Sequence, residues 1–145
     1  ISATDLGVVA AKAALERSKV DPKQIDHVIF GNVLQTSGDA VYLARHIGLK
    51  SGVPKEVPAL TINRLCGSGL QAILLGAQEI QLGQAEFVLA GGTENMSMAP
   101  MMGNSPSLSP AIFSNPDDIE SYGIAYGMGL TAEKVAEKGS FLASH

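Results

Sequence analysis

The stretch "EVPALTINRLCGSGLQAILLGAQEIQL" (residues 56–82) changes its hydrophobic pattern halfway along. Residues 56–63 form a short apolar run bounded by polar residues, which is typical of a buried strand. From Cys66 or Gly67 to Leu82 the apolar side chains recur around much of a helical circumference, so we expect a deeply buried helix that ends before Gly83. A strand that leads directly into a helix is the building unit of an α/β sheet.

The same alternation continues on both sides of this stretch. We expect a helix over 5–20, with Thr4 or Asp5 as its N-cap and an apolar stripe at Leu6, Val9 and Ala13. A strand over 27–34, a helix over 39–52 and a third strand over 86–94 complete the pattern. The order α-β-α-β-α-β predicts the α/β class, with a mostly parallel mixed sheet and helix crossovers.

The amino-acid composition changes after residue 97. Residues 98–129 are rich in Pro, Gly and Ser and contain no Lys or Arg, which indicates a long irregular excursion of the functional kind. A short helix over 131–138 follows, with Thr131 as the expected N-cap. We therefore predict two regions, 1–97 and 98–145.

Composition and charge exclude several classes of function. Of the 145 residues, 46% are hydrophobic and 17% are charged, which is typical of a globular protein. The formal charge of -4 and the lack of a basic cluster argue against a nucleic-acid partner. No signal-peptide pattern and no run long enough to span a bilayer are visible. Because the sequence opens at Ile1 and stops directly after a helix, we expect a piece of a longer polypeptide.

Cys66 is the only cysteine, which rules out an internal disulfide, and no Cys/His set suggests a metal site. A lone cysteine is more often a small buried hydrophobe than a nucleophile. Here, however, it is expected at the carboxyl end of a strand, where parallel sheets bind ligands, and at a helix start that favours a thiolate. Gly67 and Gly69 would let a substrate approach closely. We therefore predict a nucleophile in a reducing compartment.

A second interpretation of the same residues is a dinucleotide-binding module. "GSGLQA" (67–72) fits the pattern G-x-G-x-x-A after a strand. That fingerprint requires an acidic residue about 20 positions on, and the candidate, Glu94, comes 27 residues after Gly67. The fingerprint also gives the cysteine no role.

Three segments resemble the thiolases, the acyl-CoA acetyltransferases. "NRLCGSGLQAI" (63–73) is similar to their nucleophile segment, and residues 31–69 resemble the degradative 3-ketoacyl-CoA thiolases especially. "AGGTENMSMAP" (90–100) is similar to a glycine-rich strand end in which the family usually has Ser where Asn95 stands. "YGMGLTAEKVAEK" (126–138) resembles the family's M-G-x-T-A-E stretch. The segments occur in the family's order and extend from about Leu6 to Lys138.

The resemblance implies an incomplete thiolase. Residues 1–97 would be the N-terminal half-domain without its first strand, and 98–145 the start of the inserted loop domain. The family's later motifs, which supply the catalytic base and a second oxyanion donor, are absent, so this chain alone is expected to be inactive. Gly127 stands where biosynthetic relatives have His, and residues 101–126 lack the basic residues of their loop.

The implied activity is that of an acyl-CoA C-acyltransferase, which either cleaves 3-ketoacyl-CoA with coenzyme A or condenses acetyl-CoA, through a thioester on Cys66. Coenzyme A is a substrate, and no metal or other cofactor is expected. Met128 would line the acyl pocket, and the complete protein would be a homodimer or homotetramer without nucleic-acid or membrane partners. The implied compartment is the bacterial cytoplasm, with the mitochondrial matrix as the alternative. A non-catalytic thiolase-like protein that only binds acyl-CoA is the other possibility.

Other polar residues are expected to have no part in the chemistry. Glu94 would brace the structure, and Asn63 and Arg64 would contact solvent or another subunit. No histidine is placed to act as a base in this chain, whose three are His27, His46 and His145.

Overall fold

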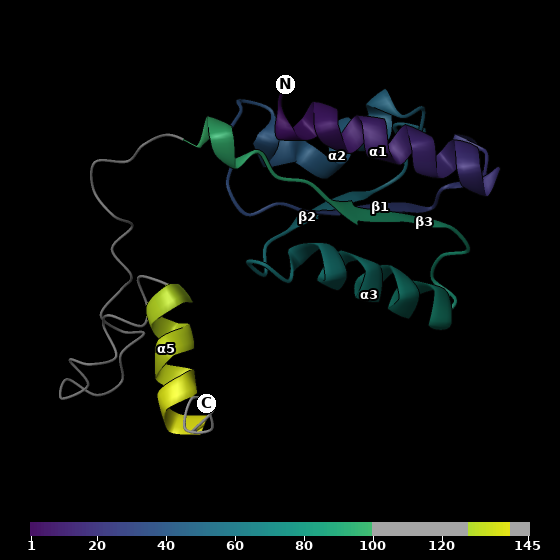
Figure 1. Cartoon of the computed structure of the whole chain (residues 1–145). Coiled ribbons are helices and arrows are strands. Elements are labelled where there is room, and N and C mark those ends of the chain that lie inside the picture. Colours follow the sequence, from purple (N-terminus) through teal and green to yellow (C-terminus); the bar gives the residue numbers. More distant parts are fainter. Residues whose placement is uncertain (100–127, 140–145) are drawn as a thin grey trace. The chain divides into compact units, whose positions relative to one another are not determined.

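The computed structural model of the chain describes residues 1–99 and 128–139 (Figure 1). The chain divides into two units, Ile1–Pro100 and Met101–His145. The first contains α1 (Ala3–Ser18), β1 (His27–Gly31), α2 (Leu43–Lys50), β2 (Ala59–Ile62), α3 (Ser68–Gln81) and β3 (Val88–Gly92), and the second contains α5 (Met128–Gly139). Short 3-10 helices lie at Pro22–Gln24, Ala40–Tyr42 and Met96–Met98. The division into 1–97 and 98–145 stays a prediction, because residues 100–127 lie outside the described ranges.

The three strands form one sheet in the order β2-β1-β3, and both pairs are parallel. The predicted α/β class with helix crossovers is therefore confirmed. Strand β1 lies in the centre and is buried along almost its whole length, as expected of a strand covered on both faces. The strands are shorter than predicted, since β1 ends at Gly31 and β2 spans only Ala59–Ile62.

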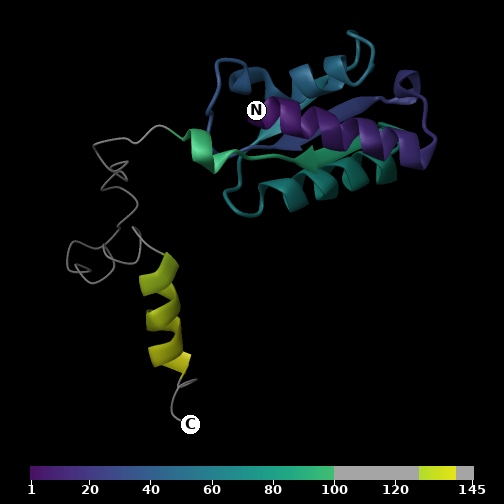
Figure 2. The same ribbon diagram turned by 45° about the horizontal axis from the view of Figure 1, so that its top comes forward.

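Helices cover both faces of the sheet. Figures 1 and 2 show α1 and α2 together on one face and α3 on the other. Val28 and Phe30 of β1 belong to the core under α1 and α2, which also contains Leu43 and Ile47. Successive side chains of a strand point to opposite faces, so the fully buried Ile29 lies on the side of α3.

Helix α1 begins earlier than predicted and buries a different face. Its N-cap is Ser2, whose hydroxyl accepts a hydrogen bond from the backbone N–H of Asp5 at 3.0 Å, so neither Thr4 nor Asp5 has that role. The predicted stripe was wrong, because Leu6 and Val9 are exposed. The buried side is made of small residues that let α1 lie close to α2 and the sheet: Ala3, Thr4, Gly7 and Ala11, followed by Leu15.

The predicted deep burial of α3 is also wrong for the described structure. Only Ser68, Ala72 and Gly76 are buried, and these lie four residues apart on one face. The large apolar side chains point away from the sheet, with exposed fractions between 46% and 64%: Leu70, Ile73, Leu74 and Ile80.

In the second unit, α5 begins at Met128 rather than after Thr131. Thr131 therefore lies inside the helix and cannot be its N-cap. The predicted irregular excursion falls almost entirely on residues outside the described ranges, as do the predictions for Gly127 and for 101–126. Within residues 1–99 and 128–139, no helix combines the length and the apolar character that a membrane span needs.

Candidate functional site at the carboxyl edge of the sheet

The carboxyl ends of all three strands meet at one edge. In the sheet register, Gly31 is opposite Ile62 on one side and Gly92 on the other, and these three residues end β1, β2 and β3. The turn that carries Cys66 follows Ile62 directly. The sequence-predicted nucleophile is therefore at the edge where open parallel sheets bind their ligands.

Cys66 is exposed, and it lies before the helix rather than in it. Helix α3 begins at Ser68, with Gly67 as its N-cap, so the predicted start at Cys66 or Gly67 is early. Gly67 has no side chain that could cap the helix, and the first N–H groups of any helix lack intrahelical partners. Cys66 is thus next to the positive end of α3, as the sequence suggested.

The residue before the cysteine has a left-handed backbone. Leu65 has a φ of 50°, which is uncommon for a residue with a large side chain and costs about 1–2 kcal/mol. Such strain persists only where the surroundings hold it in place. The turn at Cys66 shares this feature with the strained elbows that present nucleophiles in hydrolases.

Two side chains hold Leu65 in this conformation. Asn63 Oδ1 accepts a hydrogen bond from the backbone N–H of Leu65 at 2.9 Å, and Asn63 Nδ2 donates to the carbonyl of Val33 at 3.3 Å. Ser68 Oγ donates to the carbonyl of Leu65 at 2.6 Å and accepts from the N–H of Arg64 at 2.8 Å. Asn63 is exposed to solvent, as expected, and the structure gives it a local role in addition.

Close packing of glycines positions the start of α3 on the sheet. A Cβ atom on Gly31 would lie 2.5 Å from the carbonyl carbon of Ser68, and one on Gly92 would lie 3.0 Å from Cα of Gly69. The 2.5 Å approach excludes a side chain at Gly31, and the 3.0 Å approach leaves little room for one at Gly92. Gly69 was expected to give a substrate access, and in the structure it also provides the contact between helix and strand.

Glu94 connects the segments that follow β1 and β3. Its Oε2 accepts from the N–H of Val33 at 2.8 Å, and its Oε1 accepts from the N–H of Leu34 and from Asn32 Nδ2, both at 3.2 Å. Asn32 Nδ2 also donates to the carbonyl of Thr93 at 3.0 Å. The bracing role expected for Glu94 is what the structure shows. A carboxylate engaged in this way does not support the ribose-binding role that a dinucleotide site requires.

The described histidines are engaged elsewhere. His27 begins β1, at the edge opposite to Cys66, and its Nδ1 lies 2.8 Å from Oε2 of Glu79. His46 is on α2, with its ring 6.4 Å from that of Tyr42. His145 lies outside the described residues. Within the described ranges, no group of three or more His, Cys, Asp or Glu side chains is arranged for a metal ion.

Met128, the other predicted site residue, is the first residue of α5 and is exposed. It belongs to the second unit, which is described by itself. The role of Met128 in an acyl pocket therefore stays a prediction.

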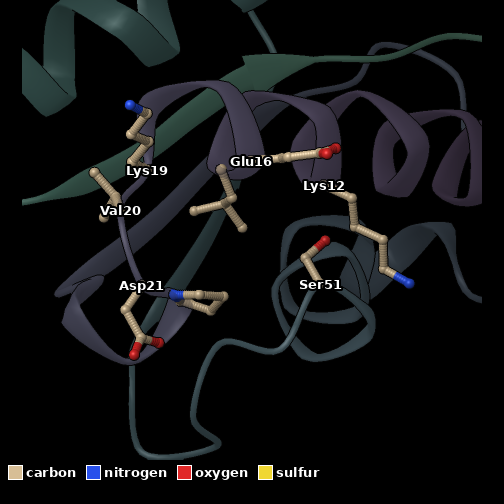
Figure 3. Close-up of a pocket in the computed structure, with 8 residues that line it drawn as sticks. Lys12, Glu16, Lys19, Val20, Asp21 and Ser51 are labelled. Carbon is tan, nitrogen blue, oxygen red and sulfur yellow. The ribbon is translucent and has the colours of Figure 1, made fainter.

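A hollow of about 410 Å³ lies between the second half of α1, the turn at Asp21-Pro22 and Ser51 (Figure 3). The hollow is at the C-terminal end of α1. The N-terminal end of α1 is the one near the carboxyl edge of the sheet, because Thr93, which follows β3, donates its Oγ1 hydrogen to the carbonyl of Ala3. In Figure 3 the charged ends of Lys12 and Asp21 point in different directions. The ionic groups around it thus do not converge on one ligand.

A parallel α/β unit that presents one exposed cysteine in a strained strand-to-helix turn belongs to the class of open-sheet proteins that have their candidate site at the carboxyl edge of the sheet. The chain matches the family model "Thiolase, N-terminal domain" over residues 1–142. The chain therefore belongs to the thiolase family.

Relatives of named function are similar over much of this chain. It is 66% identical over 99 residues to the mitochondrial 3-ketoacyl-CoA thiolase of Homo sapiens. This alignment covers 68% of this chain and 25% of the human protein. It is 45% identical over 148 residues to the acetyl-CoA acetyltransferase of Cupriavidus necator, covering 95% of this chain and 37% of that protein.

A solved structure agrees with the fold. The human mitochondrial 3-ketoacyl-CoA thiolase in complex with CoA matches with a TM-score of 0.78 and 47% identity, over 97% of this chain and 37% of the human chain. The present chain thus spans between 25% and 37% of the length of these relatives.

Proposed function

We propose that the protein containing this chain is an acyl-CoA C-acyltransferase that forms an acyl thioester on Cys66. The observation that carries the proposal is the position of the chain's only cysteine, exposed in a braced turn at the carboxyl edge of a thiolase-family sheet. Relatives named 3-ketoacyl-CoA thiolase and acetyl-CoA acetyltransferase support both the cleaving and the condensing direction.

In the cleaving direction the Cys66 thiolate attacks the 3-keto carbon of a 3-ketoacyl-CoA. The bond between the second and third carbons then breaks, and its electron pair leaves with the second carbon, which takes a proton to become acetyl-CoA. The acyl group stays on Cys66 as a thioester until the thiolate of a second coenzyme A attacks it. This frees Cys66 and gives a shortened acyl-CoA. Two covalent steps replace one difficult step, and ping-pong kinetics are expected.

This chain supplies the nucleophile and part of its electrostatic setting. Cys66 lies beside the first turn of α3, where the N–H groups without intrahelical partners form the positive end of the helix dipole. None of the hydrogen bonds of the described turn uses the N–H of Cys66, which is therefore free to donate to an oxyanion. We assign the catalytic base and the second oxyanion donor to parts of the protein beyond these residues.

The remaining features of the proposal follow the family. Met128 lines the acyl pocket, coenzyme A is a substrate, and no metal or other cofactor takes part. The complete protein is a homodimer or homotetramer, which sedimentation at micromolar concentration tests. A bacterial cytoplasm or a mitochondrial matrix fits the relatives, which are bacterial and mitochondrial proteins.

Protection of Cys66 from alkylation tests the site. The native polypeptide that contains residues 1–145 is treated with iodoacetamide in the presence of acetyl-CoA or of NAD. We expect acetyl-CoA to block labelling of Cys66 and NAD to leave it unchanged. Protection by NAD alone would support a dinucleotide module and contradict the proposal. Protection by acetyl-CoA without any acetyl group on Cys66 would indicate a protein that only binds acyl-CoA.

A further inference from the structure

The left-handed backbone of Leu65 sets the position of the residue that follows it. Leucine gains nothing from a φ of 50°, and glycine would adopt it without steric cost. If Leu65 relaxed to an ordinary conformation, the peptide between Leu65 and Cys66 would rotate. The direction of the Cys66 side chain and of its N–H would then change together.

Side chains hold both polar groups of the Leu65 backbone. The N–H donates to Asn63 Oδ1, and the carbonyl accepts from Ser68 Oγ at 2.6 Å as well as from the backbone N–H of Ser68 at 3.0 Å. The bond from Asn63 to a residue two positions on is the usual pattern of an Asx turn. Asn63 is itself held through its Nδ2, which donates to Val33 on the segment after β1. The turn is therefore fixed relative to the neighbouring strand end and not only to α3.

Ser68 is used in an unusual way for a serine at a helix start. Serine in this region commonly caps the helix by accepting from N–H groups ahead of it. Ser68 is instead the first helical residue, and its hydroxyl bonds backward, to Arg64 and Leu65. It is only 4% exposed, so its hydroxyl has little access to water as a substitute partner. The hydroxyl thus serves the turn and not the helix.

We propose that Asn63 and Ser68 are positioning residues that hold Leu65 left-handed, and so aim the Cys66 sulfur at the acyl carbon and the Cys66 N–H at the oxyanion that forms there. This inference rests on the proposed acyl transfer. It assigns these two side chains a function in the rate of Cys66 acylation and no contact with the substrate.

The test compares two reactions of the same sulfur. Acylation by acetyl-CoA requires a defined direction of attack and a placed oxyanion donor, whereas iodoacetamide needs only an exposed sulfur. In Ser68→Ala, made in the native polypeptide that contains this chain, we expect single-turnover acylation of Cys66 to slow at least tenfold. Alkylation by iodoacetamide should change less than threefold, and the KM for acetyl-CoA should change less than kcat.

Ser18→Ala is the matched control. Ser18 Oγ donates to the carbonyl of Leu15, three residues earlier, as Ser68 Oγ does to Leu65. It lies at the end of α1 away from the turn, so both reactions should keep their wild-type rates. In Asn63→Ser the hydroxyl can still accept from the N–H of Leu65, so acylation should be faster than in Asn63→Ala.

A double variant tests whether the effect passes through the Leu65 backbone. Leu65→Gly combined with Ser68→Ala should acylate at least threefold faster than Ser68→Ala alone, because glycine adopts the left-handed conformation without support. If the wild type is acylated and Ser68→Ala is acylated at the same rate, the positioning role is overturned and the proposed function stands. Equal loss of acylation and alkylation would reduce the role to general folding and also overturn it. No acylation in the wild type would refute the proposed function, and this inference with it.

Discussion

At the scale of single residues, Cys66 could be predicted as the candidate nucleophile because it is the only cysteine and lies between a strand and a glycine-rich helix start. The left-handed Leu65 could not be predicted, since leucine carries no signal for that conformation. Asn63 offered a partial signal, because asparagine commonly bonds to the backbone two residues on. No sequence signal pointed to the hydrogen bonds of the Ser68 hydroxyl with Arg64 and Leu65, because a serine near a helix start suggests an N-cap instead.

Glu94 supports a prediction at this scale. In Glu94→Gln an amide has one acceptor oxygen in place of two, so at least one of the N–H donors of residues 32–34 loses its partner. We expect the native polypeptide to lose about 1–3 kcal/mol of stability in urea unfolding. Glu16→Gln, at an exposed position on α1, should change stability by less than about 0.5 kcal/mol. Equal effects of the two changes would contradict the bracing role of Glu94.

Asp26 supports a prediction about pH. The backbone N–H groups of Phe87 and Glu86 donate to its Oδ2 at 3.0 and 2.7 Å and lower the pKa of the carboxyl below its ordinary value of 3.8. A lowered pKa in the folded state gives stability that is present above pH 3.8 and is lost as pH falls through the folded value. In Asp26→Asn, the urea concentration at half-unfolding should therefore depend less on pH in the acid range than it does in the wild type. The same acid pH dependence in the variant and the wild type would contradict the role of Asp26.

At the scale of elements, the order of helices and strands and the parallel pairing could be predicted, because hydrophobic period and turn residues carry them. Which face of each helix is buried was harder to predict. In α1 the buried side is made of small residues, so an apolar stripe of larger residues was misleading. In α3 the buried residues are the small Ser68, Ala72 and Gly76, while large apolar side chains such as Leu70 and Ile73 are exposed. Size, rather than hydrophobicity, determines these contacts.

Gly76 tests this account of α3. A Cβ atom there would lie 2.9 Å from Cγ1 of Val88 on β3. Gly76→Ala would gain about 1 kcal/mol of helix propensity but would overpack the interface at a cost of typically 1–3 kcal/mol. We expect a net loss of stability in thermal unfolding. Gly129→Ala in α5, where nothing lies within 4 Å, should not destabilise the protein. A stabilised Gly76→Ala would show that α3 does not pack closely on β3.

At the scale of the whole molecule, the described residues leave an apolar surface on α3, formed by Leu70, Ile73, Leu74 and Ile80. Exposed patches of this kind mark surfaces that are covered in the functional protein or that cause aggregation. The relatives are about three times longer than this chain, so the sequence alone could not show what covers the helix.

This surface predicts the behaviour of residues 1–145 expressed by themselves. We expect the isolated polypeptide to self-associate at micromolar concentration. Leu70→Gln combined with Leu74→Gln should raise the soluble monomer fraction in size-exclusion chromatography, because both side chains are exposed. Leu43→Gln, at a fully buried core position, should instead unfold the chain. A monomeric wild-type polypeptide that binds no apolar dye would contradict the prediction.

Mass spectrometry of the native polypeptide after mixing with acetyl-CoA shows whether Cys66 carries the acyl group. We expect an acetyl adduct of about 42 Da on the peptide that contains Cys66, by the covalent mechanism of cysteine acyl transfer. We also expect loss of this adduct on addition of free coenzyme A, and no adduct or turnover in Cys66→Ser. Acetylation at another residue, with turnover unchanged in Cys66→Ser, would contradict the claim.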